Sequence, residues 1–247
     1  MGSTDPATDP DLTGVLLRPA GVDDVEAVVA VHLAARHAAV PAMPPSVHPD
    51  SDAPPHFRSL MEHAETWVAE VDGRVVGFAL VDGAWLDHLY VLPEHAGQGI
   101  GANLLDLVKT LRPDGFALWV FESNEPARRF YRRWGLVELE RTDGSGNEEK
   151  TPDIRMAWEG ADPMGYLRGQ VDEADDELAA VLARRAALTA RIQEHKHVRG
   201  HEGRDPAREA EIVQRLTAKA PALGTEGWAR VVDAVIHASL DAAERES

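Results

Sequence analysis

The chain has 247 residues, which is long enough for two domains. Its net charge is −17: the 13 basic and 27 acidic side chains up to Asp162 give −14 and the remainder gives −3, which excludes a general attraction to nucleic acid. The lack of cysteine excludes disulfides and thiolate metal sites and favours a cytoplasmic location.

The first 14 residues are polar and contain proline, without the basic start or apolar core of a signal peptide, so we expect a disordered leader. No run of about 18 apolar residues is present, and we expect no membrane segment.

Strand and helix patterns alternate over residues 15–160. The expected strands are 15–19, 67–71, 75–81, 85–92, 116–121, 136–140 and 154–158, and the expected helices are 23–39, 101–111 and 126–134. Asp72-Gly73 predicts a type I′ hairpin turn, and the proline-rich stretch 41–55 predicts a loop. We therefore expect an α+β domain with a mixed sheet.

Two segments of this half carry functional information. In 89–101 a strand leads into a glycine-rich turn and a helix start, where backbone N–H groups and the helix dipole offer a phosphate site. The second segment is Asn124-x-x-Ala127-x-x-Phe130-Tyr131-x-x-Trp134-Gly135-Leu136. Together they resemble the two signature motifs of the GNAT superfamily of acyl-CoA-dependent N-acetyltransferases.

That resemblance implies acetyl-CoA as the cofactor and assigns several residues to it. The implied cofactor contacts are the backbone of Leu89 and Val91 for the pantetheine arm, Gln98, Gly99, Gly101 and Ala102 for the pyrophosphate, and Asn124. Tyr131 is implied as the acid that protonates the departing thiolate, with a core aromatic packed after Phe130 as the alternative. Ala96 stands where the family usually has Gln or Arg, but the backbone contacts do not need that side chain.

The acceptor amine must lose a proton before or during attack. Asp87, His88 and Glu122, on strands near the expected cofactor, are the candidate bases. The sequence does not identify the amine.

The second half has a helical pattern. Apolar residues recur at steps of three or four and predict a helix over 163–198: Leu167, Val171, Ala174, Leu178, Leu182, Leu188 and Ile192. Asp205 followed by Pro206 predicts the start of a second helix, and a third is expected over 228–242.

Arg185 interrupts the apolar face of the first helix, and Lys196 follows Ile192 by four residues. A cation there is costly unless it reaches water, pairs with an acid such as Glu209, or meets an anionic ligand. Three cations on one helix, followed by an Asp-x-x-Arg-Glu cluster, favour a pocket for a small ring with two carboxylates.

The ordered residues resemble those of the all-helical chorismate mutases. They are Leu167-Arg168, Val171-Asp172, Glu177-Leu178, Arg184-Arg185, Ile192, Lys196, Asp205-x-x-Arg208-Glu209, Ile236 and Ser239. The resemblance implies an all-α three-helix domain over 163–247 that forms an intertwined homodimer and needs no cofactor. A first helix of about 50 Å also exceeds what one small chain covers.

By the same resemblance each polar residue has a role toward chorismate or a close analogue. Arg168 reaches the partner subunit's pocket, Arg185 holds a carboxylate, Lys196 contacts the ether oxygen that breaks, Asp205 and Glu209 face the ring hydroxyl, and Arg208 and Ser239 complete the carboxylate side. The rearrangement to prephenate needs only a selected conformer and positive charge at that oxygen.

Ala243 stands where the family generally has Gln or Glu as a second donor to the ether oxygen. Three interpretations stay open: a bifunctional enzyme of one aromatic pathway, a mutase with a non-catalytic regulatory GNAT-like domain, and an acetyltransferase dimerised by an inactive mutase domain. A mutase that acts on 4-amino-4-deoxychorismate is a variant of the first. The histidines at 195, 197 and 201 lack a helical metal-site spacing, and we expect no metal.

Overall fold

The computed structural model describes residues 14–196 and 198–245 and divides the chain into two compact units, 1–167 and 168–247. The expected disordered leader lies outside the described residues, apart from Gly14. Among the described residues, no helix has both the length and the apolar character needed to cross a membrane.

The first unit is built on a seven-stranded sheet of order β1-β2-β3-β4-β5-β7-β6. The strands are β1 Val15–Pro19, β2 Glu65–Val71, β3 Arg74–Asp82, β4 Trp85–Val91, β5 Phe116–Phe121, β6 Val137–Arg141 and β7 Asp153–Trp158. The described strands pair antiparallel except for β4 with β5, which is parallel. The prediction of an α+β domain with a mixed sheet is confirmed.

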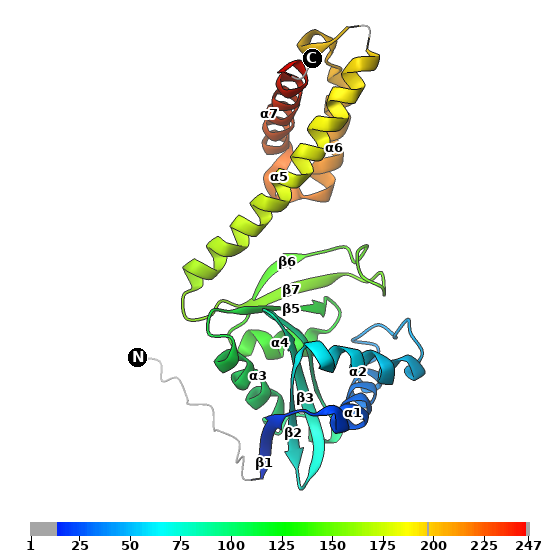
Figure 1. Cartoon of the computed structure of the whole chain (residues 1–247), viewed down its shortest axis with the longest axis vertical. Helices are drawn as coiled ribbons and strands as arrows, with labels where there is room; N and C mark the ends of the chain where they lie inside the picture. The colour runs from blue at the N-terminus through cyan, green and yellow to red at the C-terminus, as the bar shows by residue number, and fades with distance from the viewer. Residues whose placement is uncertain (1–13, 197, 246–247) are drawn as a thin grey trace. The chain divides into compact units, whose positions relative to one another are not determined.

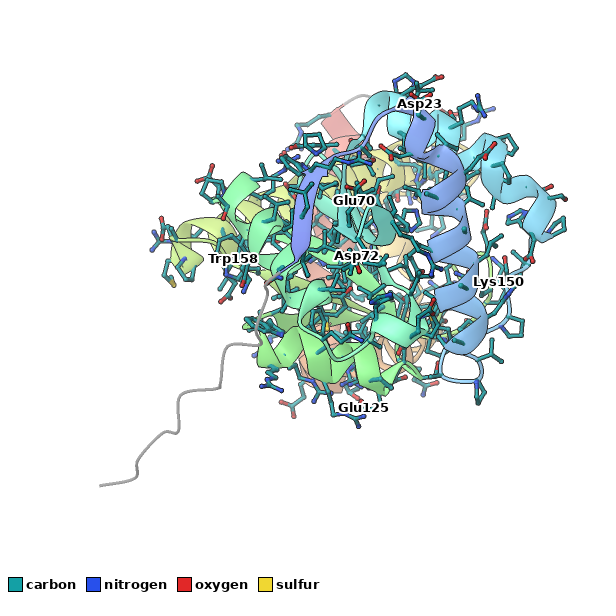
Figure 2. The ribbon with its side chains drawn as sticks, turned by 90° about the horizontal axis from the view of Figure 1, so that it is seen from below. Asp23, Glu70, Asp72, Glu125, Lys150 and Trp158 are labelled. Atoms are coloured by element: carbon teal, nitrogen blue, oxygen red, sulfur yellow. The ribbon has the colours of Figure 1, made fainter. Side chains whose placement is uncertain are left out.

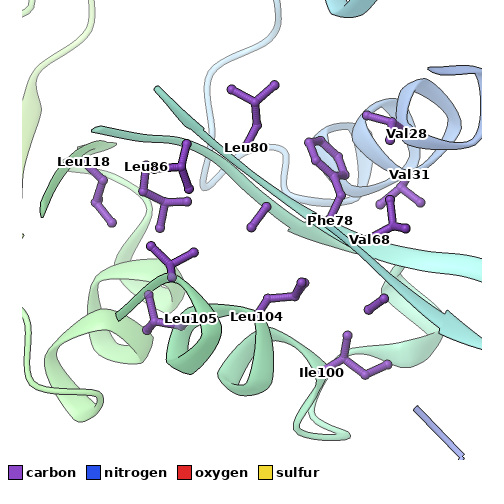
Figure 3. Packing of buried hydrophobic residues seen from close by; sticks show 14 of the residues in the cluster. Val28, Val31, Val68, Phe78, Leu80, Leu86, Ile100, Leu104, Leu105 and Leu118 are labelled. Carbon is purple, nitrogen blue, oxygen red and sulfur yellow. The ribbon is translucent and has the colours of Figure 1, made fainter. Parts of the chain in front are cut away.

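Four helices cover the two faces of this sheet (Figure 1). Helices α1 (Val25–Ala38) and α2 (Ala53–His63) lie on one face, and α3 (Ile100–Leu111) and α4 (Glu125–Arg133) lie on the other. Figure 3 shows the resulting core, with Val28 of α1 and Leu104 of α3 on opposite sides of the strand that carries Phe78. Because a strand covered on both faces must be apolar throughout, β3 is buried along nearly its whole length.

Helix α2 corrects the expected loop over 41–55, since it begins at Ala53 and continues beyond the loop's end. Pro54 and Pro55 fall in its first turn, where a missing N–H breaks no helical hydrogen bond. Phe57 on this helix is 1% exposed, so α2 contributes directly to the core. The predicted hairpin turn is confirmed, because Asp72 and Gly73 both have positive φ.

Strand β4 contains a bulge beside its parallel neighbour. Leu80 is paired with His88 but Val81 with Leu86, which leaves Asp87 as the extra residue. Beyond the bulge, His88 and Tyr90 lie on the face covered by α1 and α2, where their rings meet Phe57 and Phe78. Strands β4 and β5 are paired at one register position, Trp85 with Ala117, so they separate beyond it.

The loop of the β6–β7 hairpin reaches α1, as an ion pair between Arg36 Nη2 and Glu149 Oε1 at 2.5 Å shows. Figure 2 labels Asp23 at the start of α1 and Lys150 in the hairpin, which lies beside the second half of that helix. The hairpin therefore closes one side of the space between α1, α2 and the sheet.

The first unit ends inside the first turn of the long helix α5 (Pro163–His195). Gly115 has φ +113, and a Cβ atom there would lie 2.5 Å from the ring of Tyr166. Only glycine permits both the backbone conformation and this close approach of Tyr166.

The second unit consists of α5, α6 (Pro206–Lys219) and α7 (Gly224–Arg245), as the expected three-helix domain requires. Helix α5 ends at His195, three residues before the predicted end. Asp205 is the predicted N-cap of α6, and its carboxylate accepts hydrogen bonds from the N–H groups of Ala207 and Arg208. Every residue from 171 to 180 of α5 is exposed.

Candidate functional sites

The glycine-rich turn after β4 has the geometry of an anion site. Gly97 and Gly99 have φ of +77 and +85, conformations that favour glycine, and Gly99 is the N-cap of α3. The N–H of Asn103 donates to Gly99 O, so the helical ladder begins there and the preceding N–H groups at the helix start are available to a ligand. Gln98 differs, because its side-chain amide donates to Glu94 O within the turn.

Next to this turn, the separated strands β4 and β5 leave an edge that an extended ligand can pair with. Gly101 lies against this edge, since a Cβ there would lie 3.7 Å from Val91 and 3.8 Å from Leu89. Ala102, in the same first turn of α3, is buried. Asn124 is the N-cap of α4 and accepts a hydrogen bond from the N–H of Ala127 at 3.3 Å. The cofactor residues expected from the sequence thus surround the ends of β4 and β5.

Tyr131 is buried beneath this region and packs edge-on against Phe130 at 5.2 Å between ring centroids. Burial raises the pKa of its phenol well above the usual range, and the nearby Tyr90 adds to the increase. A phenol that stays protonated has a proton to deliver, so its burial is compatible with the acid role as well as with packing.

A cavity of about 760 Å³ lies on the other side of β4, between α1, the 40–52 loop, α2 and the β6–β7 hairpin. Of the three candidate bases, His88 lines it. Asp87 lies at the surface, where partial desolvation by its neighbours and the charge of Asp82 raise the pKa of its carboxyl. Glu122 forms an ion pair with Arg141 at 2.7 Å.

The inner wall of the cavity is formed by rings. The ring centroids of His32 and Phe57 are 4.7 Å apart, those of Phe57 and His88 5.0 Å, and those of His32 and Tyr90 4.9 Å. Desolvation by burial lowers the pKa of His32 to about 4 and that of His88 to about 3. Both imidazoles are therefore neutral at pH 7.

The sequence did not single out His32, Arg36, Phe57 or Glu149, although all four line the cavity. They come from α1, α2 and a hairpin loop, and Arg36 and Glu149 are 113 positions apart. The one usable signal was the helical spacing of His32 and Arg36, which places both on one face of α1.

In the second unit, the structure brings together Arg185 of α5 and Ser239 of α7. Arg185 Nη1 donates to Ser239 Oγ at 2.6 Å and to Val235 O at 3.2 Å. Ser239 is buried, and its hydroxyl also donates to Val235 O. Arg185, which interrupts the apolar face of α5, is thus held against α7. Neither of these two hydrogen bonds is to an acid.

The remaining expected residues each contact other partners. Lys196 Nζ donates to Gly203 O at 2.5 Å. Arg204 Nε and Nη2 donate to the two carboxylate oxygens of Glu209 at 2.8 and 2.6 Å. This pairing lowers the pKa of the Glu209 carboxyl, chiefly through the hydrogen bonds from Arg204. Arg204 was not predicted, although it directly precedes Asp205 in the sequence.

Two expected cations lie on the surface of this unit. Arg208 is exposed and pairs with Glu211 at 2.9 Å, and Arg168 is exposed near the start of α5. Asp205 is occupied as the N-cap of α6. Within one copy of the unit, the hydrogen bonds and ion pairs therefore join Arg185 to Ser239, whereas Lys196, Glu209, Asp205 and Arg208 contact other residues.

One group of possible metal ligands exists among the described residues, where the sequence predicted none. The ligand atoms of His201, Asp241 and Glu244 lie within 4.8 Å of one another, and all three residues are exposed. His201 Nε2 and Asp241 Oδ1 are 2.9 Å apart and already satisfy each other.

Comparisons with known proteins divide the chain in the same way. The model of the acetyltransferase (GNAT) family matches residues 34–136, and that of chorismate mutase type II matches residues 167–244. Peptidyl-lysine N-acetyltransferase YiaC of Escherichia coli is 32% identical over 103 residues, which are 40% of this chain and 67% of that protein. An uncharacterized N-acetyltransferase of Archaeoglobus fulgidus is 36% identical over 114 residues, covering 39% of this chain and 77% of that protein. The solution structure of apo-form YjaB from Escherichia coli matches with a TM-score of 0.50 and 26% identity, over 60% of this chain and 99% of that one.

Proposed function

Because the chain belongs to the GNAT acetyltransferase family and carries a chorismate mutase type II domain after that domain, we propose that it is a bifunctional enzyme. The first domain transfers an acetyl group from acetyl-CoA to an amine. The second rearranges chorismate to prephenate.

The observation that carries the acetyltransferase proposal is the glycine turn at the start of α3 beside the separated strands β4 and β5. Acetyl-CoA supplies the thioester; the N–H groups at the helix start bind its pyrophosphate, and the β4 edge at Leu89 and Val91 pairs with its pantetheine arm. With acetyl-CoA bound, the amine nitrogen would attack the acetyl carbon and the C–S bond would break. Tyr131 would give its proton to the sulfur, and the proton that the nitrogen loses would restore the phenol. His88 accepts a hydrogen bond from the amine.

The mutase proposal is supported by the hydrogen bond between the half-buried Arg185 and the buried Ser239. The Arg185 guanidinium hydrogen-bonds to a hydroxyl and a carbonyl rather than to an acid, which suits it to a substrate carboxylate that its planar fork can bind with two hydrogen bonds. Lys196 supplies a point charge to the ether oxygen as that oxygen becomes negative. No nucleophile or proton transfer is required.

We further propose that the second domain works as a homodimer. Large apolar side chains of α5 are exposed in the single chain: Val171, Leu178, Val181, Leu188 and Ile192. A second copy of α5 would cover them and would bring the exposed Arg168 to the partner subunit's pocket. Light scattering should give the mass of a dimer, and a stable monomer at micromolar concentration would contradict this part.

Two assays on the full chain test the two activities separately. Calorimetric titration with acetyl-CoA, followed by thiol release on addition of amines, tests the first domain. Loss of chorismate absorbance tests the second, with 4-amino-4-deoxychorismate as the alternative substrate. Binding of acetyl-CoA without transfer to any amine would reduce the first domain to a regulatory module, and turnover of neither ring substrate would overturn the mutase assignment.

A further inference from the structure

The cavity beside His88 has two chemically different ends. Its inner end is lined by the rings of His32, Phe57 and His88, and Phe57 is 1% exposed. Its outer end carries the carboxylates of Asp50, Asp52 and Glu148, whose side chains are 54%, 57% and 70% exposed. A ligand that fills the cavity therefore contacts the buried aromatic wall at its inner end and the acidic groups at its mouth.

The inner end is neutral and has unsatisfied hydrogen-bonding capacity. Nδ1 of both His32 and His88 is buried without a hydrogen-bond partner among the described residues. Buried polar atoms are normally satisfied, so these two rings have spare hydrogen-bonding capacity for a ligand with N–H or lone-pair groups. An amine meets this requirement, because it offers both.

The charges at the outer end select the sign of the ligand. Of the acids that line the cavity, Glu149 is paired with Arg36, the one Lys or Arg among the described residues of that lining, and both side chains are 14% exposed. Asp50, Asp52 and Glu148 have no Lys or Arg partner in the lining, and their contacts there are with the imidazoles of His37 and His48. The mouth therefore has an excess of negative charge, which attracts a cation.

We propose that the acetyl acceptor is a small amine that carries a second positive charge, that is, a diamine or polyamine. The amine to be acetylated lies against His88 and His32, the carbon chain lies along Phe57, and the second ammonium lies among Asp50, Asp52 and Glu148. This inference rests on the proposed acetyltransferase function and specifies its substrate class. The transfer forms one C–N bond and breaks the thioester C–S bond, and the amine proton balances the proton taken up by the thiolate.

Cadaverine and pentylamine provide a matched test, because they share a carbon chain and differ in the second ammonium group. With the full chain and acetyl-CoA, we expect cadaverine to give the higher kcat/KM by about tenfold, since several partly exposed charge contacts each contribute modestly. Calorimetric titration of the two amines in the absence of acetyl-CoA should show the same preference without relying on catalysis. Equal kcat/KM and equal affinity would overturn the inference.

Variants locate the effect at the mouth. Asp52→Asn with Glu148→Gln should lower kcat/KM for cadaverine by about threefold to tenfold and leave that for pentylamine unchanged. Glu62→Gln, which removes an exposed acid of α2 outside the cavity lining, should change neither. Because Glu148 also contacts His48, Asp52→Asn alone is measured as a second variant that leaves this link intact.

The results separate this inference from the function on which it rests. If acetyl-CoA does not bind, the proposed acetyltransferase function fails. If acetyl-CoA binds and both amines are acetylated equally well, or if the double variant affects both amines equally, the transferase stands and the diamine assignment is wrong. Preferred acetylation of a peptidyl lysine over cadaverine would also overturn it.

Discussion

The two units differ in how far a single chain completes them. The first buries a continuous core on both sides of its sheet, including Phe57, Phe78 and Phe116. The second buries Val232, Leu240, Ala243 and Ser239 on α7 and no residue of α5. Apolar surface is stable mainly when it is removed from water, so the first unit is complete as a single chain, whereas the proposed homodimer would cover the apolar residues that α5 leaves exposed.

The largest expected effect concerns Arg185, which a single copy of the second unit holds in place through Ser239. Arg185→Ala should lower chorismate turnover by about a thousandfold, because a substrate carboxylate in a closed pocket would lose its charge partner. Ser239 should stay in place, since its hydroxyl also donates to Val235 O. Arg184→Ala, at the exposed neighbour, is the control and should retain turnover. An equal loss of chorismate turnover in both variants would contradict the role assigned to Arg185.

In the first unit, the matching test is Gly99→Glu. A positive φ is costly for a residue with a side chain, and the added carboxylate would repel the pyrophosphate, so we expect the affinity for CoA to fall by at least about a hundredfold. Gly83→Glu introduces the same residue at another positive φ with open space around it, and should retain the affinity measured by calorimetry. Chorismate turnover should not change in either variant. CoA affinity that survives Gly99→Glu would place the phosphate site elsewhere.

The variant Leu178→Glu tests whether the second unit forms a dimer through α5. Leu178 is 52% exposed in the single chain, and a charge there would be buried by dimer formation. We expect the dimer to dissociate at about tenfold to a hundredfold higher protein concentration, as seen by analytical ultracentrifugation. Leu223→Glu, at a residue 53% exposed outside α5, should leave the dimer intact. A dimer unaffected by the charge at 178 would mean that α5 is not the interface.

The stability of the first unit should depend on pH, with His88 and His32 both contributing. The pKa of His88 is lowered to about 3 in the folded state by burial, while the unfolded value is about 6.5. Between these values the unfolded chain binds the proton and the folded chain does not, so the free energy of unfolding falls as the pH falls below 6.5. His88 should account for about 2 kcal/mol of loss between pH 6.5 and 5.

Urea unfolding monitored by tryptophan fluorescence at several pH values measures this loss, with His88→Phe as the comparison. The variant removes the titrating group from among the rings that surround it, and should be less sensitive to acid than the parent protein by that amount. Identical pH profiles would show that His88 does not stay neutral in the folded state.

The smallest expected effect is at Ala243, which is 5% exposed. Ala243→Gln adds the donor that related mutases generally have, and should raise chorismate turnover by about tenfold, less than a preorganised donor can give because the larger side chain must find room. If 4-amino-4-deoxychorismate is the substrate, the variant should bring no gain with chorismate. Assays of both substrates with both proteins decide between these outcomes.

The sequence predicts a structural feature well when the residues that determine the feature are adjacent in the chain. The turn at Gly97 and Gly99 and the N-cap Asp205 depend on adjacent residues, and both were predicted with their conformational role. Helix α2 was not predicted, because its two prolines signal a loop unless they fall in a helical first turn.

The cavity beside His88 could not be assembled from the sequence, because its wall combines single residues from α1, α2 and a hairpin loop. Arg36 and Glu149 carry no spacing relation that would pair them, and His32 resembles any histidine on an amphipathic helix. Arg204 was overlooked for a different reason: its partners Glu209 and Asp233 are known only once α6 and α7 pack together.

The contact between Tyr166 and Gly115 bears on how such a fusion can be cut or can arise. The start of α5 is part of the fold of the acetyltransferase unit, so a gene truncated after residue 162 would remove Tyr166 and leave a hole beside Gly115. Recombination between two ancestral genes at this junction therefore has to preserve the helix start on the acetyltransferase side. Expression of the first half alone should give well-folded protein only when the reading frame extends through Leu167.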